Sequence, residues 1–260
     1  MKTKTIAICN QKGGVGKTTT TVNLGVGLAK EGKKVLLIDC DPQGNLTTSL
    51  GFDVEDPKMR TLSDALIDTM QEIEIDPKSL ILHHKEGVDL IPANISLAMT
   101  ETNLVTAMSR ETTLKRFLAT IDGSYDYILI DCLPSLGMLM QNALAASNLV
   151  LVPVVPQFLS ATGMMQLFET IRRVKKHINS ELNLLGIVLT IVDKRTKLSK
   201  ETVKALRENL GDIKIYDSQI PLRSKAAEAP LSGGSIFEYA GRSDVAQAYM
   251  DLTKEVLNNG

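Results

Sequence analysis

The sequence predicts an α/β fold: a single doubly wound domain in which a mostly parallel central sheet carries helices on both faces. Two observations predict this class. Short apolar runs alternate with helix-like stretches along almost the whole chain, which is typical of parallel strands buried on both sides. A glycine-rich turn also separates the first apolar run from the first helix-like stretch, as in a phosphate-binding loop. We expect one domain over residues 1–260, with no helix-turn-helix domain before the first strand.

The predicted phosphate-binding loop joins an expected strand over residues 5–9 to an expected helix over residues 18–30. Glycines let successive backbone N–H groups face an anion, and a helix N-terminus adds unpaired donors. In such a loop the lysine before the helix contacts the β- and γ-phosphates, and the next threonine hydroxyl binds Mg²⁺. The residues predicted to bind nucleotide here are Lys12, Gly13, Gly14, Val15, Gly16, Lys17, Thr18 and Thr19.

The loop departs from the ordinary G-x-x-x-x-G-K-[ST] pattern in one place. Gln11 stands where that pattern requires glycine, and a second lysine, Lys12, precedes the glycines. This is the deviant Walker A form, K-G-G-x-G-K-T. A plain turn between a strand and a helix does not need two lysines, three glycines and two threonines in one register. We therefore interpret the stretch as a nucleotide site.

Two carboxylates, Asp39 and Asp41, follow the second expected strand at residues 35–38. Parallel strands bring their carboxyl ends to one edge of a sheet, where ligands bind. In a nucleotide hydrolase, one carboxylate can hold Mg²⁺ through water while the other orients the attacking water. The alternative is an ordinary turn at a strand end, because Asp-Pro and Gly are turn formers. Residues 53–87 are expected to form short helices and loops on one side of the sheet.

The alternation continues to the end of the chain. Further strands are expected at residues 88–91, 127–130, 149–152 and 184–191, and helices at residues 112–120, 138–146, 161–178 and 200–209. Asp131 directly follows the strand at 127–130, which is the Walker B pattern, in which the carboxylate orders the Mg²⁺ shell. Many core strands end in aspartate without a function, so this pattern is weak alone. Residues 131–137 are expected to form a turn that senses the γ-phosphate.

Together these motifs resemble the ParA/Soj branch of the deviant Walker A ATPases, in the MinD/ParA superfamily, over nearly the whole chain. Residues 10–20 and 35–45 look like two signatures of that branch, and further matches are Leu90-Ile91-Pro92-Ala93-Asn94, Ile220-Pro221 and Glu228-Ala229-Pro230. The chain departs from the usual family pattern at Cys132-Leu133-Pro134, at residues 155–160, and at Lys225, where many relatives have arginine.

The resemblance implies an ATP hydrolase with a weak, Mg²⁺-dependent basal rate, which binds ATP or ADP and forms a face-to-face homodimer with ATP. It implies that Lys12 reaches the phosphates of the partner, where a second cation would stabilise transition-state charge. Asp41 matches the residue that positions the hydrolytic water. The implied residues are Lys12, Lys17 and Asp41 for catalysis, Thr18, Asp39 and Asp131 for Mg²⁺, and Pro221 together with the loop for the nucleotide.

The charge of the chain is unevenly distributed. The formal net charge is −1, yet residues 172–225 contain thirteen Lys and Arg against six Asp and Glu, a net charge of +7. A basic segment on an otherwise acidic protein is typical of a surface that binds the DNA backbone, although a solvated helical face has the same composition. Arg195 and Lys225 match family positions implicated in DNA binding. We expect nonspecific contacts to the phosphates of double-stranded DNA.

The last expected helix bears on the choice between DNA and membrane. MinD-like relatives end in a basic amphipathic helix that lies on a membrane. Here Val245, Tyr249, Leu252 and Val256 share one face, and the polar positions, which include Asp244, Asp251, Lys254 and Glu255, are not basic. We therefore expect this helix to dock on the core, and we expect no membrane partner.

As a whole the sequence predicts a cytoplasmic, nucleoid-associated DNA-partitioning ATPase. Its ATP-bound dimer would coat DNA and would be released when a ParB-type centromere-binding protein stimulates hydrolysis. The alternative from another class is a nucleotide-gated scaffold that positions a different cargo with little turnover. A MinD-like membrane ATPase is a further alternative.

Overall fold

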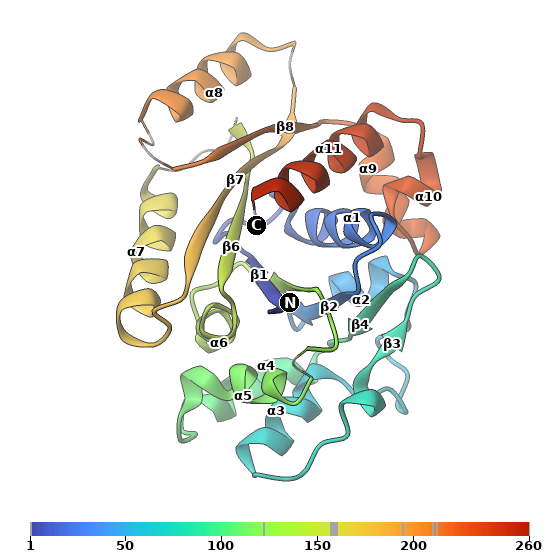
Figure 1. The fold of residues 1–260 in the computed structure, drawn as a ribbon, viewed down its shortest axis with the longest axis vertical. Helices are drawn as coiled ribbons and strands as arrows, with labels where there is room; N and C mark the ends of the chain where they lie inside the picture. The colour runs from blue at the N-terminus through green and yellow to red at the C-terminus, as the bar shows by residue number, and fades with distance from the viewer. Residues whose placement is uncertain are drawn as a thin grey trace.

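An eight-stranded sheet forms the centre of the structure, which is a computed structural model (Figure 1). It describes residues 2–121, 123–156, 161–193, 195–209, 211 and 213–259. The strand order is β3-β4-β2-β5-β1-β6-β7-β8, and neighbouring strands are parallel except for β3 and β4. The strands are β1 (Lys4–Ile8), β2 (Val35–Cys40), β3 (Leu82–His83), β4 (Val88–Ile91), β5 (Tyr127–Cys132), β6 (Leu149–Val154), β7 (Asn183–Val192) and β8 (Ile215–Pro221).

Helices cover both faces of the sheet, so the predicted doubly wound fold is confirmed (Figure 1). Ile6 and Ile8 of β1 pack into one core cluster and Ala7 into the other, because successive strand side chains point to opposite faces. The first face carries α1 (Lys17–Lys30), α2 (Asn45–Ser49), α9 (Ser224–Glu228), α10 (Ile236–Ala240) and α11 (Asp244–Asn259). The second carries α3 (Leu62–Met70), α4 (Ser96–Leu104), α5 (Thr113–Ala119), α6 (Met138–Ala146), α7 (Ala161–His177) and α8 (Lys197–Asn209).

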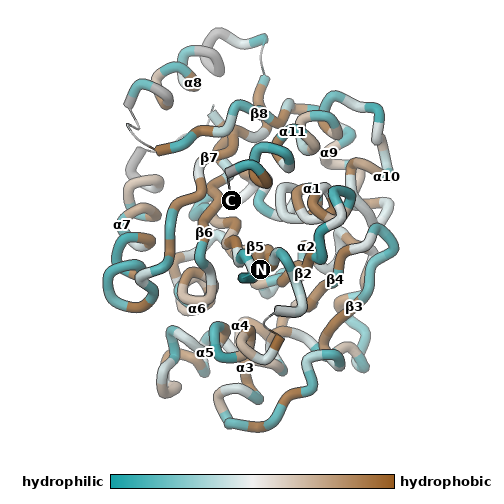
Figure 2. Tube along the Cα trace, in the orientation of Figure 1, coloured by the Kyte–Doolittle hydropathy of each residue, from teal (hydrophilic) through white to brown (hydrophobic). Residues whose placement is uncertain are grey.

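The central strands are apolar along most of their length, as Figure 2 shows. However, β2 and β5 continue past their predicted ends to Cys40 and Cys132. Asp39 and Asp131 therefore lie inside these strands, and not directly after them, and the two residues are register partners. The correction has a simple cause, because backbone pairing in a sheet continues through a polar residue when the neighbouring strand supplies its partners.

Two strands and four α-helices were not predicted. Residues 53–87 form α3, a 3₁₀ turn over Pro77–Leu80 and β3, which pairs antiparallel with β4. The expectation of helices and loops alone was wrong for β3, since two residues carry no recognisable period. The edge strand β8 contains the polar run Asp217, Ser218 and Gln219. Its sequence is therefore hard to distinguish from that of a loop. The unpredicted helices are α2, α4, α9 and α10, and the role of α4 is described below.

The predicted docking of the last helix on the core is confirmed. In α11, Val245, Tyr249, Leu252 and Val256 are all buried, and the helix packs on β8 and α1. In the part of the chain that the structure describes, no helix combines the length and the apolarity that crossing a membrane requires.

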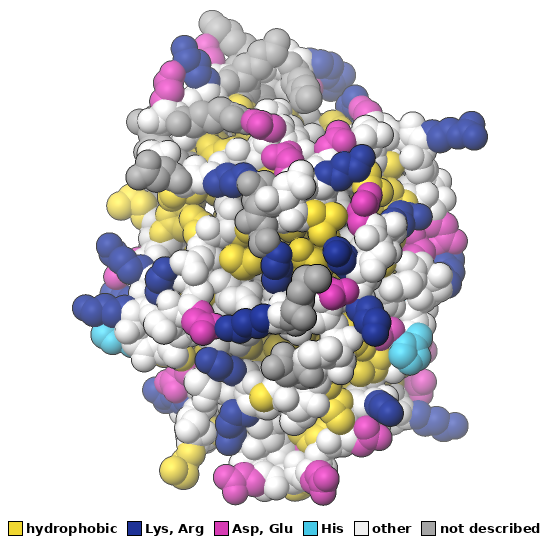
Figure 3. Space-filling model, viewed as in Figure 1, with side chains coloured by type: hydrophobic (Ala, Val, Ile, Leu, Met, Phe, Trp, Pro, Cys, Tyr) yellow, Lys and Arg dark blue, Asp and Glu magenta, His cyan; other side chains and the backbone are white. Residues whose placement is uncertain are grey.

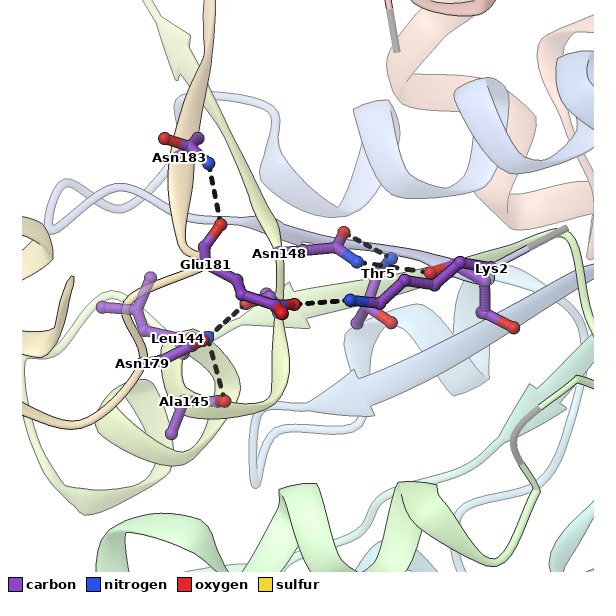
Figure 4. A network of polar contacts seen from close by, with 10 residues as sticks. Lys2, Thr5, Leu144, Ala145, Asn148, Asn179, Glu181 and Asn183 are labelled. Atoms are coloured by element: carbon purple, nitrogen blue, oxygen red, sulfur yellow. Dashed lines mark hydrogen bonds and ion pairs between the residues drawn. The ribbon is translucent and has the colours of Figure 1, made fainter.

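A network of polar contacts lies at the amino ends of β1 and β6 (Figure 4). The Asn148 side chain accepts the Thr5 N–H at 3.0 Å and donates to the Thr3 carbonyl oxygen at 3.2 Å. Asn179 donates to three carbonyl oxygens at the end of α6 and just after it, those of Leu144, Ala145 and Ser147. These contacts satisfy buried backbone groups, and they lie at the opposite edge of the sheet from the glycine-rich loop.

Candidate functional site

The glycine-rich loop connects β1 to α1, and left-handed glycines shape it. Gly14 and Gly16 have φ angles of 71° and 81°, which other residues rarely adopt. Gly16 is the N-cap of α1, and no side chain caps the helix there. The N–H groups of its first turn are therefore available to an anion. Gly13 is different, because its φ is not in the left-handed region, and a Cβ atom at this position would meet nothing within 4 Å.

The two lysines of the loop differ in their surroundings. Lys17 is 8% exposed, and its Nζ donates to the Lys12 carbonyl oxygen at 3.2 Å. The lysine thus folds back over the loop, with its charge beside the backbone that would surround a phosphate. Lys12 is exposed, and its backbone N–H donates to Asn10 Oδ1 at 3.0 Å. Asn10 in turn donates to the Pro153 carbonyl oxygen at 2.7 Å, which anchors the loop to β6.

Asp131 meets the start of α1 through two threonines. Thr18 Oγ1 donates to Asp131 Oδ2 at 2.7 Å, and Thr21 Oγ1 donates to Asp131 Oδ1 at 3.3 Å. The sheet order explains this, because β5 lies beside β1 and its carboxyl end faces the loop. The predicted threonine and carboxylate are therefore in direct contact across 113 residues of chain.

Burial controls the ionisation of the two aspartates in the strands. Desolvation, helped by the Asp39 charge and opposed by Thr18 and Lys17, raises the pKa of Asp131 to about 8. Desolvation also raises the pKa of Asp39 to about 6, against the hydrogen bonds from Thr47. A nearby cation would favour the charged form of both carboxylates. The hydroxyl and carboxylate oxygens of Thr18 and Asp131 are ligands of the kind that Mg²⁺ takes, so they fit that ion.

The described residues contain no cluster of three or more His, Cys, Asp or Glu side chains arranged to hold a metal. This does not conflict with Mg²⁺, which is commonly held by one or two carboxylates together with substrate phosphates and water. The arrangement fits a metal that arrives with a nucleotide better than one held in a cage of protein ligands.

Both carboxylate oxygens of Asp39 accept hydrogen bonds within the protein. Its Oδ2 accepts from the Thr47 N–H at 2.9 Å and from Thr47 Oγ1 at 2.8 Å, and its Oδ1 accepts from the Asp41 N–H at 3.2 Å. Thr47 Oγ1 also accepts the Ala93 N–H at 3.1 Å. Asp39 thereby joins α2 to the loop that precedes α4. Its proposed contact with Mg²⁺ stays a prediction.

A cavity of about 650 Å³ lies in front of the glycine-rich loop. Its wall includes Lys17, Thr18 and Thr19 from the loop, and Asp41 from the turn after β2. Asp41 Oδ1 accepts the Gln43 N–H at 3.0 Å. The other walls come from residues 133–135 after β5, where a phosphate-sensing turn was expected, and from Ile95 and Ala98 beside α4. The cavity brings together most of the residues that the sequence predicted for nucleotide chemistry.

Pro221 lies in a smaller cavity of about 140 Å³ on the other side of Gly16 and Thr19. This cavity is mainly apolar, and its other walls include Ile191 and Leu222. A small apolar space beside a phosphate-binding loop suits a flat ring attached to a phosphate chain. Pro221 lines this cavity, and its contact with a nucleotide base stays a prediction.

The end of β7 contributes residues that sequence reasoning missed. Thr190 Oγ1 donates to the Val15 carbonyl oxygen at 2.7 Å, which ties β7 to the loop. The next residue, Ile191, has a φ of 53°, an unusual conformation for a β-branched residue. The only sign of the Thr190 contact in the sequence is a threonine inside the apolar run 184–191. Nothing in the sequence indicates the unusual backbone conformation of Ile191.

The two predicted DNA contacts, Arg195 and Lys225, differ from each other. Arg195 follows β7, and its side chain is 86% exposed. Its guanidinium makes two hydrogen bonds of 2.9 Å to Asp193, which hold the pKa of that carboxyl at about 2. Lys225 is exposed on α9. On the face shown in Figure 3, lysine and arginine side chains are interspersed with acidic ones. Two parts of these predictions lie outside the described residues. They are Lys194, which precedes Arg195, and residues 157–160, which belong to the stretch 155–160 that departs from the family pattern.

Known proteins resemble the chain over most of its length. A protein-family model described as an AAA domain matches residues 3–184. The sporulation initiation inhibitor protein Soj of Bacillus subtilis (strain 168) is 46% identical over 257 residues, which cover 99% of each chain. The chromosome partitioning protein ParA of Caulobacter vibrioides (strain NA1000 / CB15N) is 40% identical, covering 98% of this chain and 94% of the relative.

The fold also resembles solved structures. A crystal structure of cobyrinic acid a,c-diamide synthase from Mycobacterium smegmatis, with bound ATP analogue and magnesium, superposes with a TM-score of 0.85. That protein is 35% identical, and the match covers 98% of this chain and 95% of the other.

Proposed function

The chain belongs to the ParA/Soj-type partitioning ATPases of the MinD/ParA family, and from this premise we propose that it is an ATP-driven DNA-partitioning protein. It binds ATP with Mg²⁺, dimerises, binds DNA without sequence preference and leaves DNA after hydrolysis. One observation carries the catalytic part of this proposal. Thr18 contacts Asp131 at 2.7 Å, and Asp41 lies in the wall of the cavity that also contains Thr18.

Different residues of the cavity have different roles in phosphoryl transfer. The loop N–H groups and Lys17 bind the β- and γ-phosphates, and Thr18 and Asp131 hold Mg²⁺, which neutralises phosphate charge when it is bound. Asp41 accepts a hydrogen bond from the attacking water and orients it toward the γ-phosphate. Asp39 would act on a bound Mg²⁺ through water, and its hydrogen bonds from Thr47 hold the carboxylate in place.

The dimer forms over the mouth of the cavity. Lys12 is exposed on the loop there, so its charge can reach the phosphates bound by a second copy. Ile95, which lines the cavity, is 70% exposed, and Met99 on the same edge of α4 is 67% exposed. Covering such apolar side chains favours association. The proposed interface therefore combines the second lysine of the loop with an apolar rim.

DNA binding uses the exposed cations of the basic segment, with Lys225 and Arg195 as the named contacts. Lysine and arginine neutralise phosphates and release counterions, so the binding carries no base information. A ParB-type partner stimulates hydrolysis and so releases the dimer, and the protein works in the cytoplasm on the nucleoid. The membrane alternative is disfavoured by α11, whose apolar face is buried in the core.

Three measurements on one preparation test the proposal. Light scattering with ATP or ADP reports the dimer, filter binding on unrelated duplexes reports DNA affinity, and phosphate release reports hydrolysis. We expect a dimer with ATP alone, equal affinity for all duplexes, and faster hydrolysis when DNA and the partner are added. A dimer that forms with ATP but neither binds DNA nor turns over appreciably would instead support the positioning scaffold.

A further inference from the structure

Glu101 connects two parts of the nucleotide cavity that are distant in sequence. It lies on α4, one turn after Ala98, which lines the cavity. Its Oε1 accepts the Leu139 N–H at 3.2 Å, in the first turn of α6. The N-cap of α6, Gly137, supplies no side-chain cap of its own. An acidic side chain from another helix therefore satisfies an N-terminal donor of α6, where the helix dipole favours negative charge.

The segment that this contact anchors is the wall of the cavity. Leu133, Pro134 and Ser135 line the cavity directly before α6. Within this turn the Ser135 N–H donates to the Leu133 carbonyl oxygen at 2.9 Å, and the Gly137 N–H donates to Ser135 Oγ at 3.1 Å. The turn is short and internally bonded, so its position depends on where α6 begins. Glu101 fixes that point.

The fit between Glu101 and Gly137 leaves no spare room. A Cβ atom at Gly137 would lie 2.3 Å from Glu101 Oε1, so any larger residue must displace the carboxylate. The backbone of Gly137 has φ −69° and ψ −165°, which any residue can adopt. A larger residue at this position would therefore disturb the Glu101 contact without straining the backbone. Two separate substitutions can remove the same contact, one from each side.

We propose that Glu101 is a positioning residue for nucleotide hydrolysis, because it anchors α6 and so places the 133–137 turn against the γ-phosphate side of the cavity. This inference rests on the proposed ATPase function. Glu101 does not line the cavity, so it acts through the turn and not on the nucleotide. The same helix carries the exposed Ile95 and Met99, so α4 links the turn to the rim that we assign to the dimer.

The test uses Glu101→Ala, Gly137→Ala and the double variant, with Glu74→Gln on the exposed surface as a control. Each single variant should lower kcat about tenfold, as expected for a misplaced catalytic wall, while KM and ADP affinity change less than about twofold. Because both variants break one contact, the double variant should be no slower than Glu101→Ala. Glu101→Gln keeps an acceptor oxygen and should restore most of kcat.

Hydrogen exchange without nucleotide gives a readout that does not need turnover. The Leu139 amide should exchange faster in Glu101→Ala and in Gly137→Ala than in the wild type. Unchanged exchange in both would overturn the anchor, whether or not the protein hydrolyses ATP. Faster exchange with unchanged kcat, or a fall in kcat matched by losses of Tm and ADP affinity, would overturn the positioning role. A wild type without turnover would instead overturn the proposed function.

Discussion

Asp41 is the residue whose removal should separate ATP binding from ATP hydrolysis. It lines the cavity, and among the described residues its side chain accepts one hydrogen bond, from the Gln43 N–H, so its carboxylate can also accept a hydrogen bond from water. Asp41→Ala should bind ATP normally and lose hydrolysis by about 10²–10⁴-fold, the usual contribution of a positioned proton acceptor. Phosphate release and ATP affinity should be measured on the same sample.

A matched control for this variant exists on the surface. Asp53 makes the same contact to the residue two positions on, accepting the Glu55 N–H at 2.9 Å, but it does not line the cavity. Asp53→Ala should leave hydrolysis unchanged. If Asp41→Ala mainly lost ATP affinity, the carboxylate would be assigned to the shape of the loop and not to the water.

Gly13 and Gly14 should respond differently to the same substitution. Gly13 has open space around it in the protomer, so Gly13→Val should leave the apo protein as stable as the wild type. A branched side chain should nevertheless block the ATP-dependent dimer, where a second copy and its phosphates must approach closely. Gly14 has a φ of 71°, so Gly14→Val should distort the loop and weaken nucleotide binding itself.

Light scattering with ATP, run beside thermal unfolding without nucleotide, distinguishes these outcomes. A Gly13→Val protein that still dimerises with ATP would show that the interface leaves this position open. A Gly13→Val protein that is already unstable without nucleotide would contradict the open surroundings seen here.

At the scale of elements, α11 should behave as core and not as a membrane anchor. Leu252 is fully buried, so Leu252→Ala should lower the free energy of unfolding by about 2–5 kcal/mol. Lys254 is exposed on the same helix, and Lys254→Ala should change it by less than about 0.5 kcal/mol. Urea unfolding measures both. Unchanged stability of Leu252→Ala, together with lost binding to anionic vesicles, would revive the membrane alternative.

The elements also show how far the sequence can predict this fold. The bounds of β4 at residues 88–91 and α6 at residues 138–146 were predicted to the residue, because each is a mainly apolar segment between turn formers. The edge strand β8 was missed, since an edge strand exposed on one side needs no continuous apolar run. Its polar residues are satisfied from α11, whose Glu255 accepts the Ser218 N–H at 2.8 Å.

Some residues of the candidate site could likewise be predicted from the sequence, and others could not. Lys17, Thr18 and Asp41 were predicted, because their spacing carries chemistry within one short segment. Thr190 and Glu101 were not, because their roles arise only when the sheet order and helix packing bring distant segments together. A threonine in a strand or a glutamate on a helix looks the same in sequence whether it supports a site or faces solvent.

For the whole molecule, the proposed DNA binding depends on how the charges are arranged, because the net charge of the chain is −1. The two predicted DNA contacts, Arg195 and Lys225, differ in their ion pairing. Arg195 is paired with Asp193 by two hydrogen bonds, whereas among the described residues no ion pair engages Lys225. A paired arginine contributes less net charge to a phosphate than an unpaired lysine does. Lys225 should therefore be the stronger contact.

The last prediction concerns DNA binding across a salt series. Lys225→Ala and Arg195→Ala should each weaken binding to all duplexes alike without lowering basal ATPase, with the larger loss for Lys225→Ala. Each lost contact should lower the log–log salt slope by about one, or roughly two in a dimer. Asp193→Asn frees the Arg195 guanidinium and should strengthen binding. Lys58→Ala, an exposed lysine outside the basic segment, is the control. Unchanged affinity and slope in both alanine variants would remove the basic segment from the DNA surface, and a parallel loss of ATPase would show that these side chains support the fold.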